Sequence, residues 1–252
     1  MLLENKKAIV TGGSRGIGVG IATALAEAGA DVAIFYRARE EEAKKVIDKI
    51  SSLGRKGISR KIDITNYEEL EKGVKFVHEY FGKIDILVNN AGRSPRPVKD
   101  GDRELKDWRN TLELDLNAVF YCTKAVLGYM RKQGFGSIIN ISSANARMLS
   151  PTSGPYSAAK SAVEAFTKIS AKEEGSNGIR VNAVAPGVID TEMSVKMLEA
   201  MTESERKEMI GSIALGRLGS PMDIGRAVAF LSSDNASYIT GEVLNVNGGI
   251  QM

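Results

Sequence analysis

The chain has 252 residues, and its 34 basic and 31 acidic residues give a formal net charge of +3 at pH 7. The charges are interspersed, which argues against a nucleic acid or a membrane surface as a partner, and no apolar run approaches the roughly 18 residues of a membrane span. One cysteine, Cys122, allows no internal disulfide, so we expect a reducing compartment and a cytoplasmic location.

Apolar, β-rich runs alternate with segments of helical periodicity along the whole chain, and no linker or repeat divides it. Strands are predicted at residues 6–13, 31–37, 57–65, 84–92, 136–143, 179–187 and 242–249. Helices are predicted at residues 18–30, 40–54, 66–82, about 103–132, 154–175 and 223–233. This alternation is typical of a parallel sheet with helices on both faces. The sequence therefore predicts an α/β fold, a single-domain Rossmann-type doubly wound parallel sheet of about seven strands over residues 1–252.

The segment TGGSRGIG (residues 11–18) follows the first predicted strand and begins the first predicted helix. Its glycines let the chain turn tightly and approach a pyrophosphate, which the free N–H groups at a helix N-terminus stabilise. Their spacing differs from the common G-x-G-x-x-G pattern, and an ordinary strand–turn–helix connection is the alternative. The cofactor contacts predicted here are Gly12, Ser14, Arg15, Gly16, Ile17 and Gly18.

The end of the second predicted strand, FYRARE, bears on the choice of cofactor. Folds that bind NAD place an acidic residue there to bind the ribose 2′-hydroxyl. Here Tyr36 and Arg37 come first, Arg39 is close by, and no acid appears before Glu40. Arg15 in the glycine-rich loop adds another cation. Because this pattern suits a 2′-phosphate, NADP(H) is preferred over NAD(H) as the cofactor.

Two further strand ends complete the predicted cofactor site. Asp63 ends the third strand and is a plausible acceptor for the adenine amino group, although a turn cap is the alternative. The segment NNAG ends the fourth strand in a turn of small residues, which lets a cofactor pack closely. The residues assigned to the cofactor here are Asp63, Ile64, Asn90, Ala91 and Gly92.

The segment GPYSAAK (residues 154–160) carries the candidate chemistry. Tyr156 and Lys160 lie four residues apart on a predicted helix and so share a face. A phenol with a pKa of about 10 exchanges protons poorly at neutral pH, but a nearby cation favours the phenolate. A surface pair without function is the alternative. The only histidine, His78, can complete neither a zinc site nor a Ser-His-Asp triad, so no metal is expected.

These motifs, in this order, resemble the short-chain dehydrogenase/reductase family over essentially the whole chain. The resemblance rests on TGGSRGIG, NNAG, LELDLNAVF, INISS, YSAAK and PGVIDT. It implies that Tyr156 is the general acid/base and that Lys160 binds the nicotinamide ribose and favours the phenolate. It implies that Ser143 donates a hydrogen bond to the substrate carbonyl, with Ser142 pointing to the other side of its strand. Asn117 would support a water-mediated proton relay to Lys160, and a hydrogen bond within its helix is the alternative.

The resemblance also implies the rest of the cofactor site and the reaction. The nicotinamide carboxamide would meet the PGVIDT segment, and a carbonyl with NADPH would give a secondary alcohol with NADP. Family members are mostly homotetramers, so a homotetramer is expected. The substrate loop is expected at about 188–216, where methionines suit either an adaptable apolar wall or a lid helix packed on the core. The cofactor residues assigned to PGVIDT are Pro186, Gly187, Ile189 and Thr191.

Within the family, the sequence is most similar to 3-oxoacyl-acyl-carrier-protein reductases of fatty acid biosynthesis, through KIDILVNNAG, VNAVAPG and YITGEVLNVNGG. The expected substrate is therefore a carbonyl compound, either free or carried on acyl carrier protein. The arginine pair that holds the carrier in those enzymes aligns with Gly134 and Asn177, and Arg131 and Lys132 lie near the first position. Sugar or polyol dehydrogenases share every motif and remain an alternative, as does a non-catalytic dinucleotide-binding module.

Overall fold

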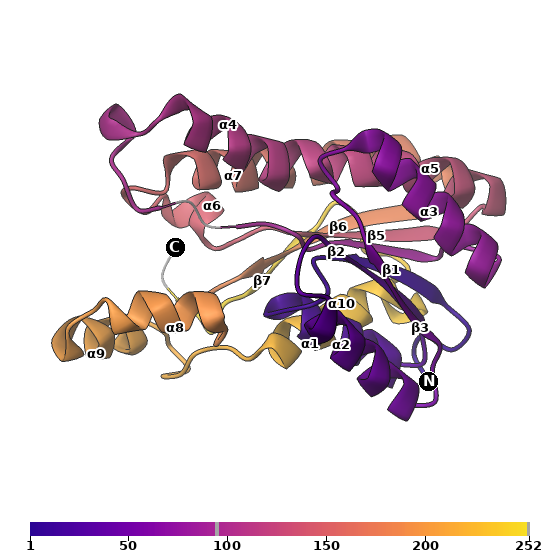
Figure 1. The fold of residues 1–252 in the computed structure, drawn as a ribbon, viewed down its shortest axis with the longest axis horizontal. Coiled ribbons are helices and arrows are strands. Elements are labelled where there is room, and N and C mark those ends of the chain that lie inside the picture. Colours follow the sequence, from indigo (N-terminus) through magenta and orange to yellow (C-terminus); the bar gives the residue numbers. More distant parts are fainter. Residues whose placement is uncertain (94–95, 251–252) are drawn as a thin grey trace.

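The computed structural model describes residues 1–93 and 96–250. Its strands form one parallel sheet of seven strands in the order β3-β2-β1-β4-β5-β6-β7 (Figure 1). This confirms the predicted fold class. The strands are β1 (Lys7–Thr11), β2 (Asp31–Tyr36), β3 (Gly57–Lys61), β4 (Ile86–Asn89), β5 (Gly136–Ile141), β6 (Ile179–Pro186) and β7 (Val243–Val246).

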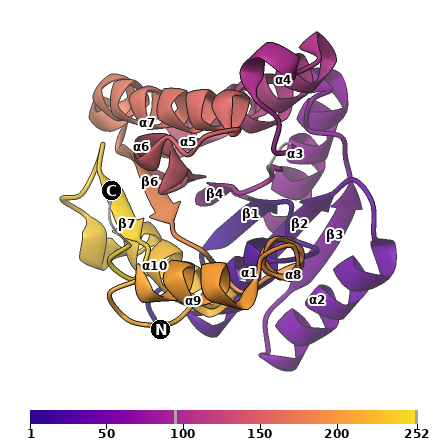
Figure 2. The ribbon, with the colours of Figure 1, turned by 90° about the vertical axis from the view of Figure 1, so that its left-hand side faces the viewer.

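Helices cover both faces of the sheet. Figure 1 shows α3, α4, α5 and α7 on one face and α1, α2 and α10 on the other. The helices on the first face are α3 (Tyr67–Phe81), α4 (Leu105–Leu112), α5 (Ala118–Gln133) and α7 (Gly154–Glu174). Those on the second face are α1 (Ile17–Glu27), α2 (Glu40–Ser52) and α10 (Pro221–Ser232). Three more, α6 (Asn145–Met148), α8 (Glu192–Glu199) and α9 (Glu203–Gly211), lie at the carboxyl ends of the strands (Figures 1 and 2).

Successive strand residues enter two separate cores, because side chains alternate between the faces of a strand. In β1, Ala8 and Val10 pack in the core that holds α1, α2 and α10, whereas Ile9 packs in the core that holds α3 and α5. Cys122 of α5 is buried in the second core. Strands buried on both faces read as continuous apolar runs, which is why the sequence locates them well.

Two glycines allow α1 and α10 to cross at close range. A Cβ atom on Gly20 would lie 2.3 Å from the backbone of Pro221, and one on Gly225 would lie 2.4 Å from the carbonyl oxygen of Gly20. The first helical turn of α10 is fixed by a capping box between Ser220 and Asp223. The helix that follows the glycine-rich loop is thus held against the sheet by a capped neighbour.

The strand order reverses between β1 and β4, since the chain moves outward through β2 and β3 on one side and through β5, β6 and β7 on the other. In doubly wound sheets, ligands bind at the carboxyl ends of the strands at such a point. The predicted site residues follow these strand ends. Among the described residues, no helix is both long and apolar enough to cross a membrane.

The helix predicted at about 103–132 differs from the structure in a way that matters for the site. It consists of α4 and α5, joined by a π-helical segment over Glu113–Asn117. Such wide turns change which side chains face a neighbouring helix and are frequent at functional sites. The segment 188–216 contains α8 and α9, each beginning with a capping box.

Candidate active site

Two positions of the glycine-rich loop show why it needs glycine. Gly12 has a φ of +64°, and a Cβ atom on it would lie 2.9 Å from Cα of Ala91. A Cβ atom on Gly18 would lie 2.2 Å from the carbonyl oxygen of Gly12, which leaves no room for a side chain. Helix α1 begins after Gly16, without a side-chain cap or an acidic residue in its first turn. Its first N–H groups are therefore placed to receive an anion.

The NNAG turn is hydrogen-bonded to this loop. The side-chain amide of Asn90 donates to the carbonyl oxygens of Thr11, at 2.8 Å, and Gly12, at 3.2 Å. The backbone N–H groups of Asn90 and Ala91 both donate to Oγ1 of Thr11, at 3.0 Å. The structure thus brings together two motifs that lie far apart in the sequence, through a threonine to which the sequence analysis gave no role.

The adenosine end of the candidate cofactor site carries exposed cations. Arg15 and Arg37 are exposed, while Tyr36 is buried at the end of β2. Arg39 has a left-handed φ of +68°, and its Nη1 atom lies 2.9 Å from Oε1 of Glu192 at the start of α8. This ion pair joins the loop after β2 to the segment that follows β6.

Asp63 caps its own turn, which is the alternative raised for it from the sequence. Its Oδ1 atom accepts hydrogen bonds from the backbone N–H of Thr65, at 3.0 Å, and from Oγ1 of Thr65, at 2.7 Å. The neighbouring Ile64 is buried. These contacts fix the loop after β3 at the same end of the sheet as the glycine-rich loop.

The PGVIDT segment also reaches the glycine-rich loop. Thr191 begins α8, and its Cγ2 atom lies 3.6 Å from the position of a Cβ atom on Gly16. A Cβ atom on Gly187 would lie 2.8 Å from Cα of Asn247, so the chain passes close to the segment after β7. Ile189 is buried. The segment after Pro186 at the end of β6 therefore faces the first turn of α1.

Tyr156 and Lys160 lie near the start of α7, which has a proline at its first positions. The Lys160 ammonium is 5.6 Å from the centroid of the Tyr156 ring. The Lys160 side chain is 4 % exposed, and its Nζ atom donates to the carbonyl oxygen of Ile141, at the end of β5, at 3.0 Å. Tyr156 is half-buried. A phenol open to ligands and a buried cation thus share one face of the helix.

The two adjacent serines after β5 point to different surroundings. Ser142 is buried and donates from Oγ to Oε1 of Glu164 on α7, at 2.9 Å. Glu164 in turn pairs with Arg147 at 3.3 Å. Ser143 is half-buried, and its Oγ atom accepts a hydrogen bond from the backbone N–H of Asn145 at 3.1 Å. Because that hydroxyl accepts here, its own proton is free to be donated elsewhere.

Asn117 makes the hydrogen bond within its own helical segment that was the alternative to a role beside Lys160. The Asn117 amide donates to Oε2 of Glu113 at 2.6 Å, within the π-helical segment. The side chain from this segment that contacts the Lys160 ammonium is that of Asp115, whose Oδ1 atom lies 3.3 Å away. Residues two positions apart on a helix point in nearly opposite directions, so Asp115 and Asn117 cannot both face Lys160.

The Asp115–Lys160 pair is enclosed by protein. Asp115 is fully buried and accepts from the backbone N–H of Arg93 at 3.3 Å. A Cβ atom on Gly92 would lie 2.5 Å from Oδ1 of Asp115 and 3.4 Å from Nζ of Lys160. Burial raises the pKa of Asp115, although the charge of Lys160 and the Arg93 amide act in the opposite direction. The pair therefore lies directly under the NNAG turn.

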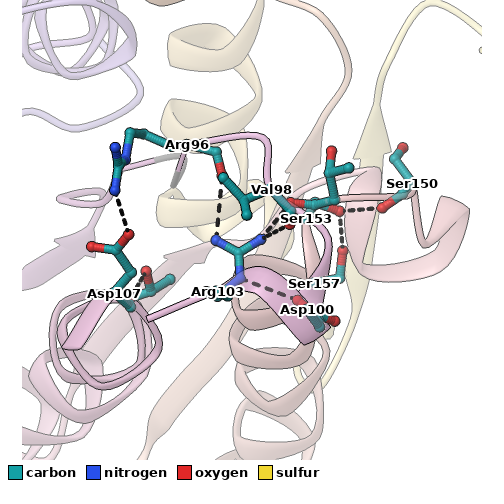
Figure 3. Close-up of polar contacts among 10 residues, drawn as sticks. Arg96, Val98, Asp100, Arg103, Asp107, Ser150, Ser153 and Ser157 are labelled. Atoms are coloured by element: carbon teal, nitrogen blue, oxygen red, sulfur yellow. Dashed lines mark hydrogen bonds and ion pairs between the residues drawn. The ribbon is translucent and has the colours of Figure 1, made fainter. Parts of the chain in front are cut away.

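A second buried cation, Arg103, fixes the loop before α4 to the start of α7 (Figure 3). Its side chain is 2 % exposed, and its Nη2 atom donates to the carbonyl oxygens of Val98, at 2.5 Å, and Thr152, at 2.7 Å. It also pairs with Asp100 at 3.1 Å. Thr152 has a φ of +68°, which non-glycine residues rarely adopt. These bonds fix the chain just before Tyr156.

The single histidine lies away from these strand ends. His78 stacks on Tyr129, with ring centroids 4.4 Å apart. Both line a cavity of about 450 Å³ together with Lys83 and Lys132. Lys83 precedes β4 and Lys132 precedes β5, so this cavity lies at the amino ends of the strands. Within residues 1–93 and 96–250, no three His, Cys, Asp or Glu side chains gather in a way that could hold a metal ion.

Comparisons with known proteins extend over nearly the whole chain. A family model described as enoyl-(acyl carrier protein) reductase matches residues 12–251. A 3-oxoacyl-[acyl-carrier-protein] reductase FabG from Vibrio cholerae is 42 % identical over 252 residues, which is all of both chains. The chain belongs to the short-chain dehydrogenase/reductase family.

Other members are similar over nearly their whole length. A FabG reductase from Staphylococcus epidermidis is 39 % identical over 98 % of this chain and 100 % of its own. A 3-oxoacyl-[acyl-carrier-protein] reductase from Synechocystis is 40 % identical over 99 % of this chain and 98 % of its own. The crystal structure of a protein described as a short-chain alcohol dehydrogenase from Sinorhizobium meliloti superposes with a TM-score of 0.93 at 36 % identity, covering 98 % of this chain and 97 % of that one.

As a short-chain dehydrogenase/reductase, the chain is an oxidoreductase that uses a nicotinamide dinucleotide. The glycine-rich loop fits this group, because its close backbone contacts leave a cradle that a side chain at Gly12 or Gly18 would disturb. Sequence analysis identified this loop, NNAG and the Tyr156–Lys160 pair. It missed Asp115, although a carboxylate between Leu114 and Leu116 in a helical run needs a partner if the helix buries it.

Proposed function

We propose that the chain is an NADP(H)-dependent reductase that converts the carbonyl of a 3-oxoacyl thioester into a secondary alcohol. The observation that carries the proposal is the position of Tyr156 and Lys160 at the carboxyl end of β5. There Lys160 donates to Ile141 and faces the Tyr156 ring, and Ser143 follows the same strand. The relatives named above as 3-oxoacyl-[acyl-carrier-protein] reductases support the substrate class.

In the proposed mechanism, the chain's own residues handle the proton and the orientation. The bound nicotinamide supplies the hydride that reduces the carbonyl carbon. Ser143 donates a hydrogen bond from Oγ to the substrate oxygen, and Tyr156 transfers its phenolic proton to that oxygen as negative charge develops there. Lys160 stabilises the phenolate that remains and holds the nicotinamide ribose. The reverse reaction uses the same groups in the opposite sense.

The preference for NADP(H) over NAD(H) rests on the exposed cations near the end of β2. Arg15 and Arg37 are available to a 2′-phosphate, and the residues directly after β2 include no acid before Glu40. We expect Arg37→Asp to shift the ratio of kcat/KM for NADPH over NADH toward NADH. Lys45→Asp, which makes the same charge change on the exposed face of α2, is the control. An unchanged NADPH preference in Arg37→Asp would remove this residue from its assigned role.

Exposed apolar side chains near the carboxyl ends of the strands favour an acyl substrate over a sugar. Met148 and Leu149 follow β5, while Met193, Met197 and Leu215 belong to the segment after β6. Figure 2 shows α6 and α8 on opposite sides of these strand ends. We assign the segment 188–216 to the substrate side of the single domain. A sugar would need polar partners here, because buried hydroxyls left unpaired are costly.

A carrier protein could be held only by cations that are not already paired. Arg131 pairs with Glu174 through both carboxylate oxygens, including a bond of 2.9 Å between Nε and Oε2, and Asn177 donates to the same carboxylate at 3.1 Å. The side-chain bond from Arg131 lowers the pKa of Glu174 despite burial, so the pair stays charged and mutually neutralised. Lys132 is exposed. We therefore expect a thioester of coenzyme A or a pantetheine to serve nearly as well as a carrier-bound substrate.

We place the contact face of the homotetramer expected for this family on α5 and α7. Phe120 of α5 and Phe166 of α7 pack edge to face with ring centroids 6.1 Å apart, and Phe120 is 47 % exposed. Ile169 of α7 is also exposed. Multi-angle light scattering measures the assembly, and Phe120→Asp should lower the mass if this face forms the contact.

A substrate panel tests the proposed function. Acetoacetyl thioesters, sugars and simple ketones are compared, each with NADPH and with NADH, by following oxidation of the reduced cofactor. We expect the highest kcat/KM for the thioester with NADPH. Faster turnover of a sugar would favour the polyol dehydrogenase alternative. Binding of NADPH without turnover of any carbonyl compound would refute the reductase and favour a binding module.

A further inference from the structure

The starting observation is a carboxylate where the sequence analysis placed an amide. Asp115 is fully buried, and its Oδ1 atom lies 3.3 Å from the ammonium of Lys160, which is itself nearly inaccessible. The Asn117 amide is bonded to Glu113 instead. A buried ion pair thus lies within the candidate active site. One of its members is Lys160, the residue assigned to favour the Tyr156 phenolate.

The charged groups around this pair are few. Lys160 of α7 and Arg93 of the loop after β4 act on Asp115, the latter through its backbone N–H and its charge. The Lys160 ammonium faces Asp115, the Tyr156 ring and the carbonyl oxygen of Ile141.

Two carboxylates on the neighbouring helices have other partners. Glu164, one helical turn beyond Lys160 on α7, is bonded to Ser142 and Arg147. Asp107 of α4 pairs with Arg96. Asp115 is therefore the carboxylate in contact with the Lys160 ammonium.

A cation that already contacts an anion stabilises a second anion less strongly than a free cation does. Both ions of the pair are buried in the protein interior, and charges interact more strongly there than they do in water. The Lys160 charge that reaches Tyr156 is therefore partly cancelled by Asp115. Lys160 therefore stabilises the Tyr156 phenolate less than an uncompensated lysine would, which suits a residue that must donate a proton during reduction.

We propose that Asp115 is a positioning residue that holds the Lys160 ammonium, offsets part of its charge and so sets the pH range in which Tyr156 exchanges its proton. This inference rests on the proposed function for its meaning in catalysis. Its electrostatic content does not depend on the substrate.

The decisive experiment titrates Tyr156 directly, without any substrate. Tyrosine labelled with carbon-13 at Cζ is followed by NMR from neutral to alkaline pH in the full chain, and the Tyr156 signal is the one missing from Tyr156→Phe. We expect Asp115→Asn, which is nearly equal in shape, to move the midpoint of the Tyr156 titration downward by about one pH unit or more. With an active substrate, the alkaline limb of kcat for carbonyl reduction should move in the same direction.

Glu113→Gln is the matched control, because it neutralises a carboxylate of the same π-helical segment that is bonded to Asn117 rather than to Lys160. It should leave the Tyr156 midpoint in place. An unmoved or higher midpoint in Asp115→Asn, or an equal shift in Glu113→Gln, would overturn the proposal. A shift in the NMR titration without turnover of any substrate would refute the proposed function and leave this inference standing.

A second comparison covers the case in which Asp115→Asn fails to fold. Removing both members of a buried ion pair leaves no uncompensated charge, so Lys160→Met/Asp115→Asn is expected to fold where a single change does not. Its Tyr156 midpoint is compared with that of the wild type. If Asp115 offsets the charge of Lys160, removal of both residues should leave the midpoint close to the wild-type value. A midpoint that rises by about one pH unit or more would mean that Asp115 offsets little of that charge and would overturn the proposal.

Discussion

The two sides of the site are formed by different kinds of group, backbone on one side and charged side chains on the other. On the side of β1 to β3, the cradle consists of backbone: Gly12, Gly18 and the carbonyl oxygens that receive Asn90. On the side of β4 to β6, the site consists of buried charged side chains, above all the pair of Lys160 with Asp115. A backbone cradle depends on local glycine spacing, whereas a side-chain site depends on how neighbouring helices are rotated. Substitutions on the two sides should therefore fail in different ways.

The largest effect is expected at the phenol. Tyr156→Phe removes the proton that the mechanism transfers, and general acid catalysis of this kind is worth roughly 10³-fold. We expect kcat to fall by about that factor while the Kd for NADPH, measured by fluorescence, stays nearly unchanged. Retained activity would place the proton transfer on another group. A large rise in Kd would mean that the backbone cradle does not bind the cofactor independently of the catalytic side.

The adjacent serines give the next largest effect and a matched pair. Ser143→Ala should lower kcat by roughly 100-fold, because a hydrogen bond to the developing oxyanion is lost. Ser142→Ala should instead lower the free energy of unfolding by about 2 kcal/mol, because the buried Glu164 loses a hydrogen bond, with little change in kcat. Kinetics and urea denaturation of both variants separate the two outcomes. A loss of kcat in Ser142→Ala together with a loss of stability alone in Ser143→Ala would mean that Ser142, and not Ser143, contacts the substrate.

A smaller effect, on cofactor binding and stability, is expected from a substitution in the glycine-rich loop. Gly18→Ala forces a Cβ atom against the carbonyl oxygen of Gly12, so we expect the Kd for NADPH to rise about tenfold and stability to fall by about 2 kcal/mol. Gly128→Ala on α5 is the control, because no atom lies within 4 Å of the added Cβ, and it should be neutral or slightly stabilising. Equal effects of the two substitutions would contradict the close contact on which the cradle depends.

The smallest effect concerns the cap of α10, the helix that holds α1. A hydrogen bond from Arg217, followed by bonds from Ser220, lowers the pKa of Asp223 from 3.8 to about 2. Because the folded value is the lower one, the stability it contributes is present above pH 3.8 and is lost as the pH falls toward about 2. We expect Asp223→Asn to lower the free energy of unfolding by about 1 kcal/mol at pH 7, without a change in kcat.

Urea denaturation across the acid range measures this contribution. The difference between the wild type and Asp223→Asn should shrink below pH 3.8. Asp48→Asn, an exposed change on α2, controls for the loss of a carboxylate as such. A difference that persists unchanged at pH 2 would show that the charge of Asp223 is not what stabilises the cap.

The same contrast explains which parts of the fold and of the site could be predicted from the sequence. Alternating apolar runs and glycine-capped helices are local patterns, and they gave the parallel sheet, the glycine-rich loop and the segment with Tyr156. The choice between Asp115 and Asn117 depends on a wide helical turn, and nothing in the periodicity of LELDLN marks the turn as wide. Arg103 was missed for a similar reason, since its partners are backbone carbonyls brought near by the fold.

The burial of Cys122 gives the chain a built-in reporter of its own opening. Burial raises the pKa of this thiol to about 12, so the reactive thiolate is scarce while α5 stays packed. Labelling by a thiol reagent must therefore wait until the core beneath α5 opens, and its rate measures how often that happens. Because the sequence contains one cysteine, every labelled molecule reports on the same place, the core under α5 on the face of the sheet that α7 also covers. Ligands that bind the folded chain should lower the rate of Cys122 labelling in proportion to their occupancy.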